Sequence, residues 1–148
     1  MALLEEPIVS FGPAPALAVD IAGAPIICSE DDFKGVHIAA DSLSRDLYEI
    51  TGRPRVVHRV VVDTLRDEGF DLDIAIIAGS INSTLIQTLS RDGNFDVSGL
   101  KGKWESFMTK VLEDPLPGVR RALVIAGSDK RGTIFGVHTL AEQCGQSP

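Results

Sequence analysis

Apolar and polar positions along the chain follow two kinds of spacing, which predict an alternating order of strands and helices. In the segment 31–52 the apolar residues recur three and four positions apart, as in an amphipathic helix. They are Phe33, Val36, Ala40, Leu43, Leu47 and Ile50. Ser29 and Asp31 or Asp32 offer the side-chain oxygens that cap a helix start, and Gly52 predicts the helix end.

The rest of the pattern consists of short, apolar, β-branched runs and two further helical segments. Strands are expected at 7–11, 16–30, 55–62, 71–80, 102–118 and 120–128, and helices at 81–93 and 132–145. Because strands alternate with helices and have continuous apolar interiors, we expect an α/β sandwich. Its central sheet is expected to be mostly parallel or mixed and flanked by helices, and residues 1–148 are expected to form a single domain.

Two strand-to-loop units of this pattern are nearly identical. AIIAGS at 75–80 and LVIAGS at 123–128 are each followed by a predicted helix. Two units are fewer than a solenoid needs, so they predict two similar strand–loop–helix units in one sheet.

The second unit leads into a glycine-rich loop that resembles a phosphate-binding loop. The pattern for such a loop is G-x-x-x-x-G-K-[ST], but Thr133 stands where the lysine is needed and Ile134 where the hydroxyl is needed. Asp129 inside the loop has the wrong charge for phosphate. We therefore expect Gly127 to allow a tight turn, and Gly132 with Gly136 to let the helix pack closely on the sheet.

Composition excludes some classes of partner. The chain has 148 residues and a formal net charge of −7, which disfavours binding to nucleic acid. No apolar run is long enough to cross a membrane, and residues 1–13 lack the features of a secretory signal. Cys28 and Cys144 match no metal spacing and are expected to be buried small side chains, so they do not decide the redox compartment.

No pattern typical of a catalytic or metal site is found. His37, His58 and His138 lack the spacing of a zinc helix, and no G-x-S-x-G element exists for a serine nucleophile. The acidic segment 67–73 is expected to be a solvated connector. Trp104 could stack on a sugar ring, but a single Trp in an alternating strand is more often part of a core, and we expect that here.

Three segments carry a family resemblance. DVSGLKGKWESF (96–107), residues 116–148 with ALVIAGSDKRGTIFGVHTLAEQCGQSP, and more weakly DIAIIAGSINSTLIQTL (73–89) closely resemble the amino-terminal region of glycoside hydrolase family 115. That family comprises the xylan α-1,2-glucuronidases. The resemblance implies a fold like the accessory domain that precedes the barrel in β-hexosaminidase-type glycosidases.

The resemblance also implies a function for the whole enzyme and a limited role for this chain. The family removes glucuronic acid or its 4-O-methyl form from xylan, without a required cofactor, and its catalytic residues lie in a (β/α)8 barrel absent from this chain. We therefore expect no catalytic, cofactor-binding or metal-binding residue here. The implied partners are the barrel and, as a further option, xylan-derived uronic-acid oligosaccharides. The family is often secreted, but the compartment of this protein stays open.

The loop of Ser128, Asp129, Lys130 and Arg131 is the segment expected to face the barrel, with the last three residues forming an exposed charged tip. A chain without its barrel would expose the docking face, so a homodimer through that face is also expected. Two alternatives stay open at this point. One is a stand-alone module that binds carbohydrate or protein, and the other is a small nucleotide-binding protein.

Overall fold

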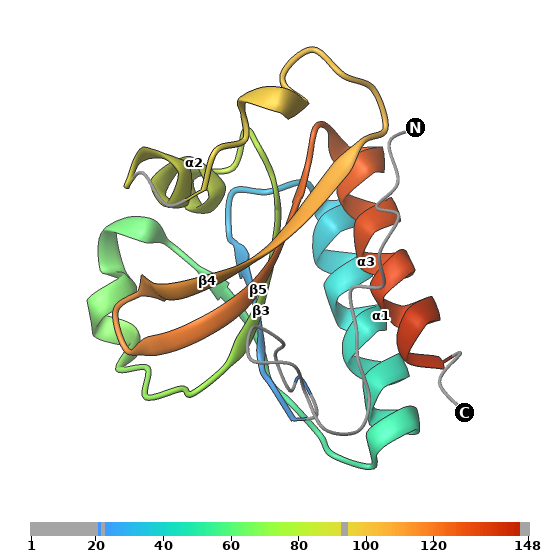
Figure 1. Cartoon of the computed structure of the whole chain (residues 1–148). Helices are drawn as coiled ribbons and strands as arrows, with labels where there is room; N and C mark the ends of the chain where they lie inside the picture. The colour runs from blue at the N-terminus through green and yellow to red at the C-terminus, as the bar shows by residue number, and fades with distance from the viewer. Residues whose placement is uncertain (1–20, 22, 93–94, 146–148) are drawn as a thin grey trace.

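A computed structural model describes residues 21, 23–92 and 95–145 of the chain (Figure 1). The strand expected at 7–11 and most of the one expected at 16–30 lie outside the described residues. The last part of 16–30 is confirmed as a strand.

Five strands form one mixed sheet in the order β2-β1-β3-β5-β4 (Figure 1). They are β1 (Ile26–Ser29), β2 (Val57–Val60), β3 (Ala75–Ser80), β4 (Phe107–Leu116) and β5 (Val119–Gly127). Strands β2, β1, β3 and β5 are parallel neighbours, whereas β4 pairs antiparallel with β5 at one edge. The expected fold class, an α/β sandwich with a mixed sheet, is confirmed.

Within the described residues, three α-helices and two short 3₁₀ helices cover the two faces of the sheet. They are α1 (Lys34–Thr51), η1 (Val62–Glu68), α2 (Thr84–Arg91), η2 (Ser98–Leu100) and α3 (Lys130–Gly145). Helices α1 and α3 lie side by side on one face, and α2 lies on the other (Figure 1). The two similar units β3–α2 and β5–α3 therefore have adjacent parallel strands but place their helices on opposite faces.

Strand order accounts for which face each connection covers. The chain moves from β1 to β2 in one direction across the sheet and from β2 to β3 in the other; after α2 it enters β4 at the edge and then returns to β5. Since connections between parallel strands are right-handed, a reversal of direction sends the connection to the opposite face. Helix α1 thus lies on one face and η1 on the other, where α2 packs into the same core cluster. The reversal creates a topological switch point between β1 and β3.

The core is built from aliphatic side chains on both faces of the sheet. On the side of α1 and α3, Ile26, Ile76 and Ile125 pack against Leu43 and Leu140. The facing side has its own cluster, in which the largest fully buried side chain is Phe95. Each fully buried Ile or Leu stabilises the fold by about 2 kcal/mol. Aliphatic residues thus fill the core of a chain that is poor in aromatics.

Several predicted elements begin later than expected, among them β2 at Val57, β3 at Ala75 and α2 at Thr84. Helix α1 begins at Lys34 with Phe33 in the N-cap position and no side-chain cap, so the expected capping by Ser29, Asp31 or Asp32 is wrong. The strand expected from residue 102 begins at Phe107, because residues 102–106 form a turn.

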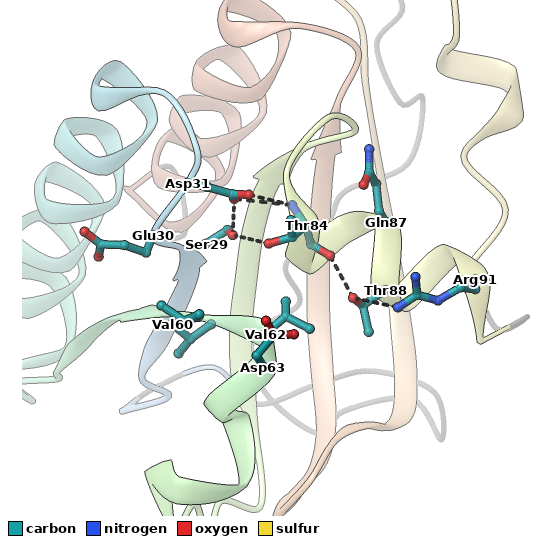
Figure 2. Close-up of a pocket in the computed structure, with 11 residues that line it drawn as sticks. Ser29, Glu30, Asp31, Val60, Val62, Asp63, Thr84, Gln87, Thr88 and Arg91 are labelled. Carbon is teal, nitrogen blue, oxygen red and sulfur yellow. Dashed lines mark hydrogen bonds between the residues drawn. The ribbon is translucent and has the colours of Figure 1, made fainter.

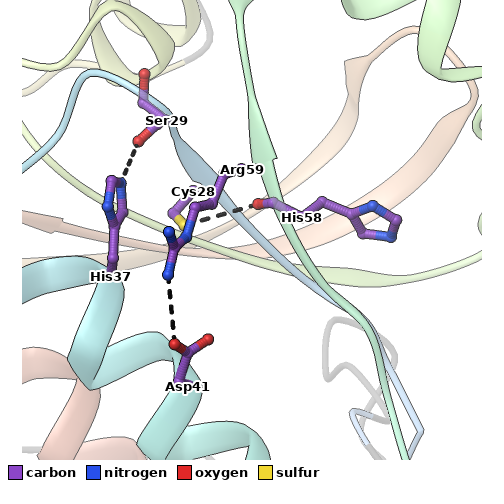
Figure 3. Close-up of polar contacts among 6 residues, drawn as sticks. All are labelled: Cys28, Ser29, His37, Asp41, His58 and Arg59. Atoms are coloured by element: carbon purple, nitrogen blue, oxygen red, sulfur yellow. Dashed lines mark hydrogen bonds and ion pairs between the residues drawn. The ribbon is translucent and has the colours of Figure 1, made fainter. Parts of the chain in front are cut away.

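Both cysteines are buried, as expected, and neither forms a disulfide; Figure 3 shows Cys28. Burial raises the pKa of Cys28 to about 12 and that of Cys144 to about 11. The thiol of Cys28 donates a 3.6 Å hydrogen bond to the carbonyl oxygen of His58. Neither side chain is poised to form a thiolate near neutral pH.

We expect both thiols to resist modification in the folded protein. At pH 8 an aromatic disulfide reagent should react with neither Cys28 nor Cys144 on the timescale of its reaction with free cysteine, because both burial and the raised pKa values suppress the thiolate. The same reagent in denaturant should titrate two thiols per chain. Rapid reaction of the native protein would contradict the buried placement.

Candidate functional site

The carboxyl ends of the parallel strands bring three loops to one edge of the sheet. Ser29 ends β1, Ser80 ends β3, and Ser128 follows β5. All three are buried. Ligand sites of open α/β sheets lie at this edge, next to the switch point, so the cavities around these loops are the candidate sites.

Two of the four residues expected to face a partner form hydrogen bonds that hold the loop together. The backbone N–H of Ser128 donates to the carbonyl oxygen of Ser106 at 2.8 Å, and the Ser128 hydroxyl accepts from the Ser106 N–H at 3.1 Å. The Asp129 carboxylate accepts from the N–H of Gly132 at 2.7 Å and from the N–H of Glu105 at 3.1 Å. The expectation that Asp129 is part of an exposed charged tip is therefore wrong, since its carboxylate caps α3.

Lys130 and Arg131 are exposed on the first turn of α3, as expected. The guanidinium of Arg131 forms a 3.1 Å ion pair with Glu105. The carboxylate of Asp129 takes an N–H at the start of α3, where a nucleotide phosphate would have to bind. This arrangement favours the structural interpretation of the glycine loop over a phosphate-binding one.

Trp104 is 83% exposed, so the expectation that it belongs to the core is wrong. Two contacts of Glu105, one through its backbone and one through its side chain, hold the turn that carries Trp104 in place. Glu105 has a φ of 51°, in the left-handed region that costs a residue with a side chain about 1 kcal/mol or more. The hydrogen bond from the Glu105 N–H to Asp129 and the ion pair with Arg131 offset this cost. An aromatic side chain is thus held in solvent beside the start of α3.

A groove of about 480 Å³ runs along the outer side of α3, and we call it the α3 groove. It is lined by Glu105, Arg131, Ile134, Phe135, His138, Thr139 and Glu142. Phe135 is 42% exposed. Exposed aromatic side chains next to an apolar groove are typical of a surface that contacts another protein or domain.

A second cavity, of about 350 Å³, lies at the ends of β1 and β2 and is acidic (Figure 2). Its carboxylates are those of Glu30, Asp31 and Asp63, and one guanidinium, Arg91, reaches its wall. Burial acts to raise the pKa of Asp31, but hydrogen bonds from the Ser29 hydroxyl at 2.5 Å and from Thr84 outweigh it and lower that pKa. Asp31 is thus ionised and hydrogen-bonded to the start of α2. A carboxylate with a lowered pKa does not suit the role of a proton donor.

A third cavity, of about 620 Å³, lies at the ends of β3 and β5 and shares Gln87 and Arg91 of α2 with the second cavity. We call it the basic cavity, because Arg91 and Lys101 are the charged residues that line it within the described part of the chain. Its other lining residues are Ile81, Asn82, Gln87, Ser90, Val97, Gly102 and Ser128. Only Ser128 belongs to the loop predicted from the sequence. Lys101 was missed because η2, which precedes it, was not predicted, and the residues of α2 carry no pattern that marks a site.

The histidines do not form a metal site. His37 is buried and its Nε2 lies 2.7 Å from the carbonyl oxygen of Ser29, whereas His58 packs edge-on against Phe70 (Figure 3 shows both histidines). Among the described residues no group of three or more His, Cys, Asp or Glu side chains is placed to hold a metal ion. The helices within residues 21, 23–92 and 95–145 include none that is long and apolar enough to span a membrane.

Comparison with known proteins finds a similar fold in one part of a larger enzyme. No family model matches the chain, and a search of curated proteins gives no match. A similar solved structure is described as "a novel family GH115 4-O-Methyl-alpha-glucuronidase, BtGH115A, with specificity for decorated arabinogalactans". The two share 29% sequence identity with a TM-score of 0.59, over 85% of this chain and 14% of that protein. This chain therefore has the fold of one small part of a GH115 enzyme.

Proposed function

We propose that this chain is a non-catalytic domain of an α-glucuronidase-like glycoside hydrolase. The observation that carries the proposal is the match over 85% of this chain to a region that makes up 14% of a GH115 glucuronidase. The coverage supports a domain role, because the hydrolase activity named for that protein belongs to a chain several times longer. The domain supports the catalytic barrel and leaves hydrolysis to it.

The docking surface for the barrel is the α3 groove together with Trp104 and the exposed cations Lys130 and Arg131. Trp104 and Phe135 supply apolar area that water covers in the free domain. The Glu105–Arg131 ion pair and the Asp129 cap fix the position of this surface before docking, so little conformational entropy is lost on association. The same exposed surface would let two copies of the isolated chain associate.

The carboxylates of the acidic cavity are not assigned to hydrolysis. A glycosidase needs one carboxylic acid that stays protonated near neutral pH, and hydrogen bonding keeps the pKa of Asp31 low instead. Neither Glu30 nor Asp63 lies in an apolar environment, since both are exposed.

The first test is hydrolysis by the purified 148-residue chain. We expect no release of uronic acid from glucuronoxylan or from a decorated arabinogalactan, with the GH115 enzyme named above as the positive control. Release by the chain alone would overturn the proposal.

The reading frame beyond the codon for Pro148 should continue into a barrel-sized segment, and an early stop codon would also count against a domain role.

In the longer protein, Trp104→Ala and Arg131→Ala should each weaken docking of the domain. We expect a lower melting temperature or a raised KM for the whole enzyme, because the barrel loses an aromatic or a charged contact. Arg45→Ala, an exposed residue of α1, is the control and should change neither. Unchanged stability and kinetics in both docking variants would remove this surface from the interface.

A further inference from the structure

We propose that Asn82 is an N-glycosylation site. Asn82, Ser83 and Thr84 form the acceptor pattern N-x-[ST], and the middle residue is not proline. The chain has one other asparagine, Asn94, and the residue two positions after it is Asp96, which has no hydroxyl. A site of this kind is expected in a surface loop. The modification does not depend on the domain role proposed above.

The loop between β3 and α2 has the expected exposure. Asn82 is exposed in a turn, whereas backbone hydrogen bonds hold the residues on each side of it. The N–H of Ile81 donates to the carbonyl oxygen of Gly127 at 2.9 Å, and the N–H of Ser83 donates to that of Ser80 at 3.0 Å. An ordered turn therefore presents the side chain of Asn82 to solvent.

The amide of Asn82 is not used by the fold that the structure describes. An asparagine near the start of a helix often caps it, but here Ser83 is the N-cap of α2 and its hydroxyl accepts from the N–H of Ile86 at 3.3 Å. The side chain of Asn82 forms no hydrogen bond within the described part of the chain. A sugar attached to its nitrogen would therefore break no such contact.

The surroundings of Asn82 also leave room for a glycan. Asn82 lines the basic cavity, which has a volume of about 620 Å³. The first sugars therefore enter an unfilled space beside α2 instead of a packed core. A glycan is bulky and solubilising, and at this position it would cover the carboxyl ends of β3 and β5.

The modification transfers an oligosaccharide to the side-chain nitrogen of Asn82. The donor is an oligosaccharide linked to a polyprenyl diphosphate, and the nitrogen forms a bond to the anomeric carbon of its first sugar. The bond from that carbon to the diphosphate oxygen breaks, the lipid diphosphate leaves, and the nitrogen loses one proton. The transferase recognises the hydroxyl of Thr84, which in the folded chain lies 3.2 Å from the Ser29 hydroxyl. The transfer therefore precedes the completion of folding.

The test is to secrete the chain from eukaryotic cells behind a signal peptide and to measure its mass. We expect one glycan per chain, which peptide-N-glycosidase removes. In heavy-oxygen water this enzyme leaves a labelled aspartate in place of the modified asparagine, and the label should lie in the tryptic peptide 67–91. The same peptide of the protein from its own cells should carry the glycan as well.

Variants assign the acceptor. Asn82→Gln and Thr84→Ala should each abolish the glycan, because the first removes the acceptor asparagine and the second removes the hydroxyl that the transferase needs. Thr84→Ser keeps that hydroxyl and Asn94→Gln leaves the pattern intact, so both variants should retain the glycan. Since Asn82 is exposed and forms no hydrogen bond among the described residues, Asn82→Gln is expected to fold and to be secreted.

Any of four results would contradict the proposal. A secreted chain without a glycan, or an Asn82→Gln variant that retains one, would show that Asn82 is not the acceptor. A sugar that resists peptide-N-glycosidase would lie on a hydroxyl oxygen instead. An unmodified peptide 67–91 in the protein from its own cells would show that the site is not used there. Each readout is a mass, so the outcome of the hydrolysis assay does not affect it.

Discussion

Replacing Gly132 with alanine is expected to lower the free energy of unfolding by about 3 kcal/mol, the upper end for overpacking a core. Gly132 lies in the first turn of α3, buried against the turn that precedes β4. A Cβ atom there would come within 2.2 Å of the carbonyl oxygen of Ser106 and 2.8 Å of its nitrogen. Both are backbone atoms, so no side-chain rotation can relieve the clash, and α3 must move.

Urea unfolding followed by circular dichroism measures this loss. Gly99→Ala is the matched control, because a Cβ at Gly99 would meet nothing within 4 Å. We expect it to change the free energy of unfolding by less than about 1 kcal/mol. Equal effects of the two substitutions would mean that α3 does not approach the sheet as closely as described.

Removing the carboxylate of Asp32 is the second change with a large expected effect. Asp32 is 9% exposed, and its two oxygens accept from the backbone N–H of Ser80 at 2.9 Å, from the Ser80 hydroxyl at 2.9 Å and from the N–H of Phe33 at 2.8 Å. It thus joins the loop after β1 to the end of β3. Asp32→Ala leaves a buried N–H and a buried hydroxyl without a partner, and we expect a loss of about 3 kcal/mol.

The neighbouring acid provides the control for this experiment. Asp31 is exposed and accepts from Thr84 at the start of α2. Water can replace it, so Asp31→Ala should cost no more than about 1 kcal/mol in the same urea titration. If the two alanine variants lose equal stability, the buried hydrogen bonds of Asp32 do not hold the switch point together.

The layout of the fold could be predicted because it depends on local patterns. Strands β3 and β5 have continuous apolar runs because both of their faces are buried. In α1 the apolar residues recur every three or four positions because one side of the helix packs on the sheet. The close packing expected at Gly132 and Gly136 is also confirmed, since a Cβ at Gly136 would come within 2.7 Å of Ile125 and 3.0 Å of Phe107.

The candidate sites depend on contacts between distant segments, and the sequence alone does not contain those distances. Trp104 follows an alternating pattern that suggests a buried strand, but the hydrogen bond between Glu105 and Asp129 turns the chain before β4 begins. The sequence suggests a surface charge at Asp129, yet its carboxylate accepts a hydrogen bond from the start of α3. Lys101 and Arg91 become neighbours of one cavity only through η2, a three-residue helix with no strong pattern.

The exposure of Trp104 also gives the protein an intrinsic fluorescent probe of its surface. It is the single tryptophan among 148 residues, so the indole fluorescence reports on this one turn. The emission wavelength of an indole already in water changes little when the chain unfolds. The emission must shift to shorter wavelength when another surface covers the indole. Fluorescence is therefore a poor probe of folding for this domain and a direct probe of whatever docks beside α3.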